Sequence, residues 1–203
     1  MNKWATICLR THIMTMTKDS TKDSTQDSTE DTLTQWLAVE EVLLARNRVG
    51  SGSLSREKVA AMTGLEVMRA VMNGELPSAP MSATMRYMMV EVEHGRVVVQ
   101  GAPAEHIMNI QGSVHGGWFG TILDSAVGNA IHTTLPAGKG YATLDLSIKM
   151  IRAIFPSVGR VRAIGTVINT GRTICTAEGV IVGPDNKIYA HATTTCLVQD
   201  LRS

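Results

Sequence analysis

The sequence predicts an α+β fold in which an antiparallel sheet of about six strands is built around one internal helix. Two observations predict the sheet. Short segments rich in β-branched residues recur between turn signals, and the connections between them are too short for parallel crossovers. A third observation predicts the helix, because an apolar stretch that opens with two glycines interrupts the series after the second strand.

Residues 1–30 are expected to be disordered. From Thr17 to Glu30 the chain is a near-repeat of Thr, Ser, Asp and Lys, which offers no apolar side chain to bury against the entropic cost of ordering. We assign this segment no function.

Residues 31–75 are expected to form two helices. In the first, apolar side chains fall near helical spacing, Thr32 and Gln35 suit a capping box, and Gly50 would stop the helix. The second helix is expected over residues 55–74, where Val, Leu and Met side chains recur at helical spacing. This stripe of side chains is most simply part of the core.

Two helices in tandem also suit a helix-turn-helix DNA reader, but the charge pattern argues against one. Their basic side chains are offset by acidic ones, and the whole chain has 19 Lys and Arg against 18 Asp and Glu, a formal charge of +1. This balance gives no general attraction for nucleic acid or for an anionic membrane. We therefore expect neither as a partner, and any basic site must be local.

Residues 76–203 are expected to contain the sheet and its internal helix. The predicted strands are residues 84–93, 96–104, 141–151, 159–168, 172–182 and 188–198. Turn signals divide them at His94-Gly95, Pro156, Asn169-Thr170-Gly171 and Pro184-Asp185-Asn186. The helix is expected to begin at Gly116 and to end before Pro136.

The composition, 44% hydrophobic and 18% charged, is that of a globular protein with one sizeable core. Cys8, Cys175 and Cys196 lie far apart without a CxxC motif, which favours reduced thiols over a disulfide or a zinc site. No metal-ligand spacing is found among His12, His94, His106, His132 and His191. No apolar run reaches the roughly 18 residues that span a bilayer, so we expect a cytoplasmic protein.

The predicted central helix is apolar around most of its circumference but carries Asp124 in its middle. Asp124 lies on the remaining strip, with Gly120 and Gly128 one turn before and after it. A mid-helix glycine costs about 1 kcal/mol relative to alanine, so two glycines beside a carboxylate suggest that another group approaches the backbone there. From the helix alone, a structural hydrogen bond within tight helix packing explains Asp124 equally well.

The sequence His115-Gly116-Gly117 at the start of this helix leaves two amides without intrahelical acceptors, at the positive end of the helix dipole. Such an arrangement suits an oxyanion hole. At about 1.5 Å per residue, Gly116 and Asp124 lie roughly 12 Å apart along one helix, so they cannot serve the same carbonyl. If both act on one substrate, two antiparallel helices from two chains must share the site across a dimer interface.

These residues resemble the PaaI-like acyl-CoA thioesterases of the hotdog superfamily, in which a sheet wraps one long helix and sites form between subunits. The resemblance extends from about Thr63 to Val198. It rests on the His-Gly-Gly motif with Asn109 before it and Asp124 after it, and on the strand segments in order. It implies a hotdog fold, an acyl-CoA substrate and a homodimer, with tetramers common. No resident cofactor is implied, because CoA enters as part of the substrate.

The resemblance implies that Asp124 is the catalytic carboxylate and that the Gly116 N–H polarises the thioester carbonyl. Asp124 would act as a general base on water or would attack directly to give a mixed anhydride. Three further positions are implied to shape the pocket or orient the water and the carboxylate: Asn109, His115 and Thr143. A lone histidine beside glycines more often caps or packs than acts as a base, so we expect structural support from His115.

The sequence departs from the family pattern at Ile110 and Ala153, where proline is common, and both changes affect loop rigidity rather than chemistry. Coenzyme A carries several phosphates, so a local cationic patch is expected at the mouth of the site. The candidate substrate-binding residues are Gly117, Lys149, Arg152, Arg160, Arg162 and Arg172.

Two other functions compete with hydrolysis. A hydroxyacyl-thioester dehydratase of the same fold would need a catalytic histidine in a different context, and no His-Phe-Pro-like loop is present. A non-catalytic acyl-CoA binding or sensing module would use the N-terminal helices as its output element. Aryl and medium-chain acyl groups both remain open.

Overall fold

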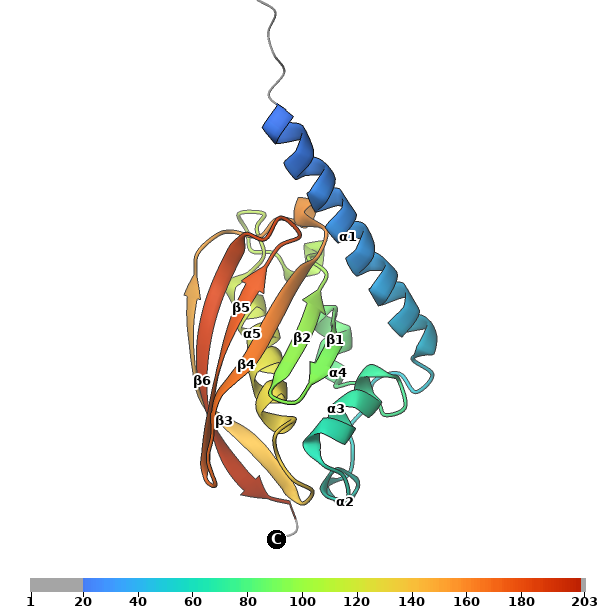
Figure 1. Cartoon of the computed structure of the whole chain (residues 1–203), viewed down its shortest axis with the longest axis vertical. Helices are drawn as coiled ribbons and strands as arrows, with labels where there is room; N and C mark the ends of the chain where they lie inside the picture. Colours follow the sequence, from blue (N-terminus) through green and yellow to red (C-terminus); the bar gives the residue numbers. More distant parts are fainter. Residues whose placement is uncertain (1–19, 202–203) are drawn as a thin grey trace, which may run out of the picture.

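The computed structural model describes residues 20–201, which form a six-stranded antiparallel sheet in the order β1-β2-β4-β5-β6-β3 (Figure 1). The strands are β1 (Tyr87–Glu93), β2 (Arg96–Gly101), β3 (Lys139–Met150), β4 (Val161–Thr170), β5 (Ile174–Val182) and β6 (Ile188–Asp200). The α+β prediction and all six predicted strands are thereby confirmed. The helices are α1 (Ser20–Arg46), α2 (Arg56–Ala60), α3 (Gly64–Met72), α4 (Pro80–Met85) and α5 (Gly116–His132), with 3₁₀ turns η1 (Glu105–Ile107) and η2 (Pro156–Val158).

Helix α5 lies against one face of the sheet, as Figure 1 shows. Two strand glycines permit its close approach. A Cβ on Gly165 would lie 2.4 Å from the Ala126 carbonyl group, and one on Gly179 would lie 2.7 Å from the Val127 side chain. Because Leu123 and Ala126 are fully buried, α5 has a fixed position from which its polar residues project.

The predicted start of this helix is confirmed. His115 is its N-cap, Gly116 is its first residue, and the helix ends at His132, before Pro136. The N–H of His115 donates to the Ile107 carbonyl, and the N–H of Val114 donates to the Ile154 carbonyl. The loop before α5 is therefore tied to η1 and to the segment after β3.

Helix α1 begins earlier than the sequence predicts. Residues 20–30 are helical where the composition predicts disorder, and residues 1–19 lie outside the described residues. The predicted capping box is wrong, because Thr32 is inside the helix and its hydroxyl donates to the Ser28 carbonyl. Once Trp36 and Leu43 anchor the helix, each further residue adds a hydrogen bond at small cost, so the polar repeat extends it.

The second predicted helix is divided into α2 and α3, because Thr63 starts a new helix. Its side chain accepts from the Glu66 N–H while the Glu66 carboxylate accepts from the Thr63 N–H, a complete capping box. Gly74 adopts φ +73° directly after α3, where the sequence predicts the stop. The short helix α4 was not predicted.

Candidate active site

Asp124 lies in the middle of α5, half-buried, and faces strand β3. The Thr143 hydroxyl donates to Asp124 Oδ1 over 3.0 Å. Thr143 precedes a β-bulge, since Thr143 pairs with Cys196 and Asp145 pairs with Thr195. The structure thus brings Asp124 and Thr143 together, and the hydrogen bond orients one carboxylate oxygen.

The glycines on either side of Asp124 face residues of the same chain. A Cβ on Gly128 would lie 2.6 Å from the Tyr141 Oη, so this glycine makes room for the tyrosine ring. A Cβ on Gly120 would lie 3.4 Å from the Ile148 side chain, an ordinary contact. The interpretation that both glycines admit an outside group is therefore wrong for Gly128, whose space the chain itself fills.

At the helix start, the two glycine amides of the His-Gly-Gly motif differ in whether they have an acceptor. The Gly117 N–H donates to His115 Nδ1 over 2.9 Å, so His115 caps the helix and the Gly117 amide is occupied. Within residues 20–201, no protein acceptor is found for the Gly116 N–H. Gly116 therefore offers the free amide of this motif, and His115 has the structural role that was expected of it.

Asn109 organises the loop before His115. Its Oδ1 accepts from the N–H groups of Gln111 and Ser113, and its Nδ2 donates to the Ser113 hydroxyl over 2.9 Å. Ile110 in this loop is fully exposed. Asn109 thus shapes the approach to the helix start through contacts within its own loop.

A cavity of about 650 Å³ opens beside Asp124. Two hydrogen-bonded pairs lie along α5 at this end: the Ser125 hydroxyl donates to Tyr87 Oη over 3.0 Å, and the Tyr141 hydroxyl donates to Asn129 Oδ1 over 3.3 Å. Burial raises the pKa of both tyrosines, and the nearby Asp124 charge raises each further. Both phenols therefore remain protonated at neutral pH.

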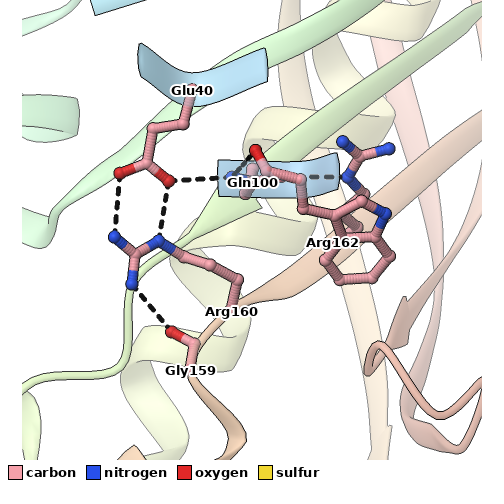
Figure 2. Close-up of polar contacts among 6 residues, drawn as sticks. Glu40, Gln100, Gly159, Arg160 and Arg162 are labelled. Atoms are coloured by element: carbon pink, nitrogen blue, oxygen red, sulfur yellow. Dashed lines mark hydrogen bonds and ion pairs between the residues drawn. The ribbon is translucent and has the colours of Figure 1, made fainter. Parts of the chain in front are cut away.

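Two of the predicted phosphate-binding arginines instead attach α1 to the sheet. Figure 2 shows Arg160 facing Glu40, and its Nε and Nη2 donate to the two carboxylate oxygens over 2.7 and 2.9 Å. Arg162 donates to Gln100 and stacks on Trp36, 4.4 Å from the ring centroid. The prediction for Arg160 and Arg162 is wrong, because both guanidiniums already have partners within the chain.

The other three cationic candidates do not all lie together in one chain: Lys149 and Arg152 lie at one end of β6, and Arg172 lies near the other. Lys149 pairs in register with His191 on β6, whereas Arg172 precedes Thr173, whose carbonyl accepts from the Val198 N–H. These points on β6 lie roughly 23 Å apart at the usual strand rise. Arg152 donates to the Ile188 carbonyl at the Lys149 end.

One arginine that sequence reasoning missed does lie at the cavity. Arg86 lines it and is the C-cap of α4, with φ +54°. A non-glycine residue in the left-handed region is uncommon, and nothing in the sequence marks Arg86 as adopting it. Its placement depends on the turn from α4 into β1.

The described part of the chain contains neither a cluster of metal-ligating side chains nor a membrane-spanning helix. Within residues 20–201, no three His, Cys, Asp or Glu side chains come together as metal ligands would. In the same range, no helix combines the length and the apolarity that a bilayer crossing requires. Cys175 and Cys196 are free and buried, while Cys8 lies outside the described residues.

With this geometry established, the domain can be compared with known proteins. Residues 111–190, which run from the loop before α5 to the start of β6, match the model of the thioesterase superfamily. This part of the sheet-and-helix domain is therefore similar to the thioesterase superfamily. The fold is the hotdog fold, as the solved relatives also indicate.

Three known proteins illustrate what this chain is similar to. A phenylacetic acid degradation-related protein of Ralstonia eutropha JMP134 is 26% identical, with a TM-score of 0.59 over 66% of this chain and 98% of its own. A Streptococcus mutans UA159 protein, solved bound to acetyl CoA, is 26% identical, with a TM-score of 0.52 over 56% of this chain and 89% of its own. A Halobacterium salinarum protein named "Putative esterase" is 34% identical over 85 residues, which is 41% of this chain and 54% of that protein. The chain thus spans about half the length of this curated relative.

Proposed function

We propose that this protein hydrolyses acyl-CoA thioesters to a free acid and CoA, with Asp124 as the catalytic carboxylate. The observation that carries the proposal is the Asp124–Thr143 pair, which lies beside a cavity of about 650 Å³ on the central helix of a domain similar to the thioesterase superfamily. The acetyl CoA bound to the Streptococcus mutans relative supports CoA esters as the substrate class.

Thioester hydrolysis needs a polarised carbonyl and an activated nucleophile, because the thiolate already leaves readily. Thr143 donates to Oδ1 of Asp124, which leaves Oδ2 for the reaction. In one route Oδ2 takes a proton from water as the water oxygen attacks the carbonyl carbon. In the other, Oδ2 itself attacks, and water then hydrolyses the mixed anhydride. In both routes the carbon–sulfur bond breaks, and a backbone amide stabilises the oxyanion.

The Gly116 amide of a second copy supplies that donor in the proposed site. Strand β3 is one of the two edges of the sheet and spans 12 residues, and among residues 20–201 no strand pairs with its outer side. Three apolar side chains beside this edge are exposed: Leu144 by 59%, Met150 by 54% and Ile151 by 53%. A long edge strand with exposed apolar side chains suits pairing with another copy.

The register of that pairing follows from contacts within one chain. Asp124 accepts a hydrogen bond from Thr143 of β3, and a Cβ on Gly116 would lie 2.9 Å from the end of the Met150 side chain, at the end of the same strand. If two β3 strands pair antiparallel with Thr143 opposite Met150 of the second copy, the Asp124 of each chain faces the Gly116 of the other. The central pair is then Leu146 opposite Ser147.

An activity assay tests the proposed chemistry. The protein is incubated with acyl-CoAs of two to sixteen carbons and with aryl-CoAs, and released thiol is followed with a thiol reagent. Asp124→Asn should reduce kcat at least about 10³-fold, the scale of a lost acid–base group or nucleophile. Glu93→Gln, which neutralises an exposed carboxylate at the end of β1, should leave kcat unchanged. Near-normal turnover by Asp124→Asn would remove Asp124 from this role, and binding without turnover by the unaltered protein would favour the sensing function.

Subunit complementation tests the shared site. Gly116→Pro removes the amide proton and should leave the backbone in place, because proline is favoured at the first position of a helix and His115 already has the extended backbone that precedes proline, φ −65° and ψ 139°. When Asp124→Asn and Gly116→Pro chains are refolded together, half of the dimers are mixed, and each mixed dimer has one intact site. About a quarter of the wild-type activity should return. A mixture as inactive as its components would place both groups of each site in one chain.

A further inference from the structure

The cavity beside Asp124 is lined mainly by residues that precede the thioesterase-superfamily match at residues 111–190. From the matched domain come only Asp124, Ser125, Asn129 and Tyr141. The remaining lining residues belong to α1, α3, α4, β1, β2 and the loops between them. The N-terminal helices and the loops that connect them therefore form most of the wall of the cavity that reaches the candidate catalytic carboxylate.

The cavity passes around the free edge of β1. Tyr87 and Met89 pack with the core on the α5 side of the sheet, whereas Met88 packs with Leu43 of α1 on the other side, and all four line the cavity. Met72 of α3 packs against the buried residues on both sides of the sheet. The lining is thus polar at the Asp124 end, and from β1 to α1 it combines apolar side chains such as Leu43 and Met88 with polar ones such as Arg86 and Gln100.

Helix α1 closes the far end of the cavity through the contacts in Figure 2. Glu40 lines the cavity, but its carboxylate is neutralised by Arg160 and also accepts from Gln100 Nε2 over 2.8 Å. Burial opposes ionisation of Glu40, yet the hydrogen bonds from Arg160 and Gln100 outweigh it and lower the pKa of the carboxyl. The Glu40 carboxylate therefore faces the cavity as a paired charge rather than an isolated one.

We propose that this cavity takes the acyl group of the substrate and that the N-terminal helices set its length, with Leu43, Met72 and Ala83 as specificity-determining residues. This inference rests on the proposed function, since the thioester carbonyl lies at Asp124. A cavity of 650 Å³ is far larger than an acetyl group needs and falls in the range that encloses drug-sized ligands. The expected substrate is an apolar, medium-chain acyl thioester of roughly eight to twelve carbons. Methionine side chains adapt to flexible chains, which favours an aliphatic group over a rigid ring.

The test fills the cavity without removing existing packing. Ala83 of α4 lines the cavity and is exposed, so Ala83→Trp places an indole there and deletes no contact made by a larger side chain. Thr84→Trp is the matched control, because Thr84 is the next residue of α4, is also exposed, and is not among the residues that line the cavity. Steady-state kcat/KM is measured with acetyl-, octanoyl- and dodecanoyl-CoA.

Ala83→Trp should lower kcat/KM for dodecanoyl-CoA at least tenfold relative to acetyl-CoA, on the scale of lost apolar burial in a substrate pocket. Thr84→Trp should leave the ratio within about twofold of the wild-type ratio. In the opposite sense, Leu43→Ala should shift the preference towards longer chains. An acyl-length profile that is the same in the wild type, Ala83→Trp and Leu43→Ala would overturn the proposal.

A binding measurement separates failure of this inference from failure of the proposed function. Binding of decanoic acid, the product of a medium-chain ester, is measured by calorimetry with the wild type, Ala83→Trp and Thr84→Trp. Binding that only Ala83→Trp weakens, without turnover of any acyl-CoA, would retain the acyl cavity and reject the hydrolase. Equal binding by all three proteins, or none by the wild type, would reject the acyl cavity.

Discussion

The α5–β3 region and the N-terminal helices differ in how they are attached to the sheet. Helix α5 is fixed by fully buried apolar side chains and by strand glycines that allow backbone contact, so its polar groups have defined positions. Helix α1 is fixed mainly by Leu43 and by the polar contacts of Trp36 and Glu40, while the side chains of Leu37, Val42 and Leu44 are exposed.

Because of this difference, the candidate catalytic groups and the groups that would select the substrate lie in different parts of the fold. Groups that must be positioned to within a fraction of an ångström lie on the rigid element of the domain. The wall that surrounds the cavity is built from helices with fewer buried anchors, which tolerate change in sequence without moving Asp124. We therefore expect substitutions in α5 and β3 to alter rate, and substitutions in α1 to alter stability and substrate choice.

After Asp124→Asn, the largest effect is expected at the helix start. Gly116→Pro should lower kcat/KM about 10²-fold relative to Gly116→Ala, since one oxyanion donor is worth this much. Both variants place a Cβ where it meets the Met150 side chain, but only alanine retains the N–H. The measurement is steady-state hydrolysis of the best acyl-CoA. Equal rates for the two variants would exclude the Gly116 amide from the reaction.

A smaller effect is expected at Thr143. Thr143→Val removes the hydroxyl that donates to Asp124 and should lower kcat about tenfold, the equivalent of one lost hydrogen bond to a charged group. Thr143→Ser retains the hydroxyl and should restore most of the rate.

In the N-terminal helices, removal of Glu40 should alter stability rather than chemistry. Glu40→Ala leaves Arg160 without its carboxylate partner and should lower the free energy of unfolding by about 1–2 kcal/mol. Limited trypsin digestion should then cleave faster after Arg46, at the end of α1, while hydrolysis of acetyl-CoA is unchanged. The control is Glu41→Gln, an exposed neighbour on the same helix. Unchanged digestion of Glu40→Ala would mean that other contacts hold α1.

The smallest expected effect is on the pH dependence of the free energy of unfolding. His132, at the end of α5, is buried beside Tyr141, and burial lowers the pKa of its imidazole. The unfolded chain therefore binds this proton at higher pH than the folded protein, so His132 makes the folded state less stable as pH falls through about 6.5. Urea unfolding at pH 7.5 and 5.5 should show this loss. His132→Phe should reduce the pH dependence, and substitution of the exposed His94 should not.

Particular residues show how far the sequence predicted the site. Asp124 stood out because it interrupts an apolar helix, and Gly116 because a helix start leaves its amide free. The sequence could not predict that His115 occupies the Gly117 amide and leaves the Gly116 amide free, since this depends on the rotamer of His115. Arg160 and Arg162 were misassigned for a similar reason: a strand position does not reveal that α1 crosses the sheet there with Glu40 and Trp36.

The sequence by itself determined the strand order along the chain, the start of the central helix and the place of Asp124 within it, because periodicity, glycines and caps act over a few residues. Only the tertiary structure decided which side chains occupy the space at Gly128, which arginines are already paired, and that the N-terminal helices form the wall of the cavity. These outcomes depend on contacts between segments far apart in the chain, and local patterns carry no information about such contacts.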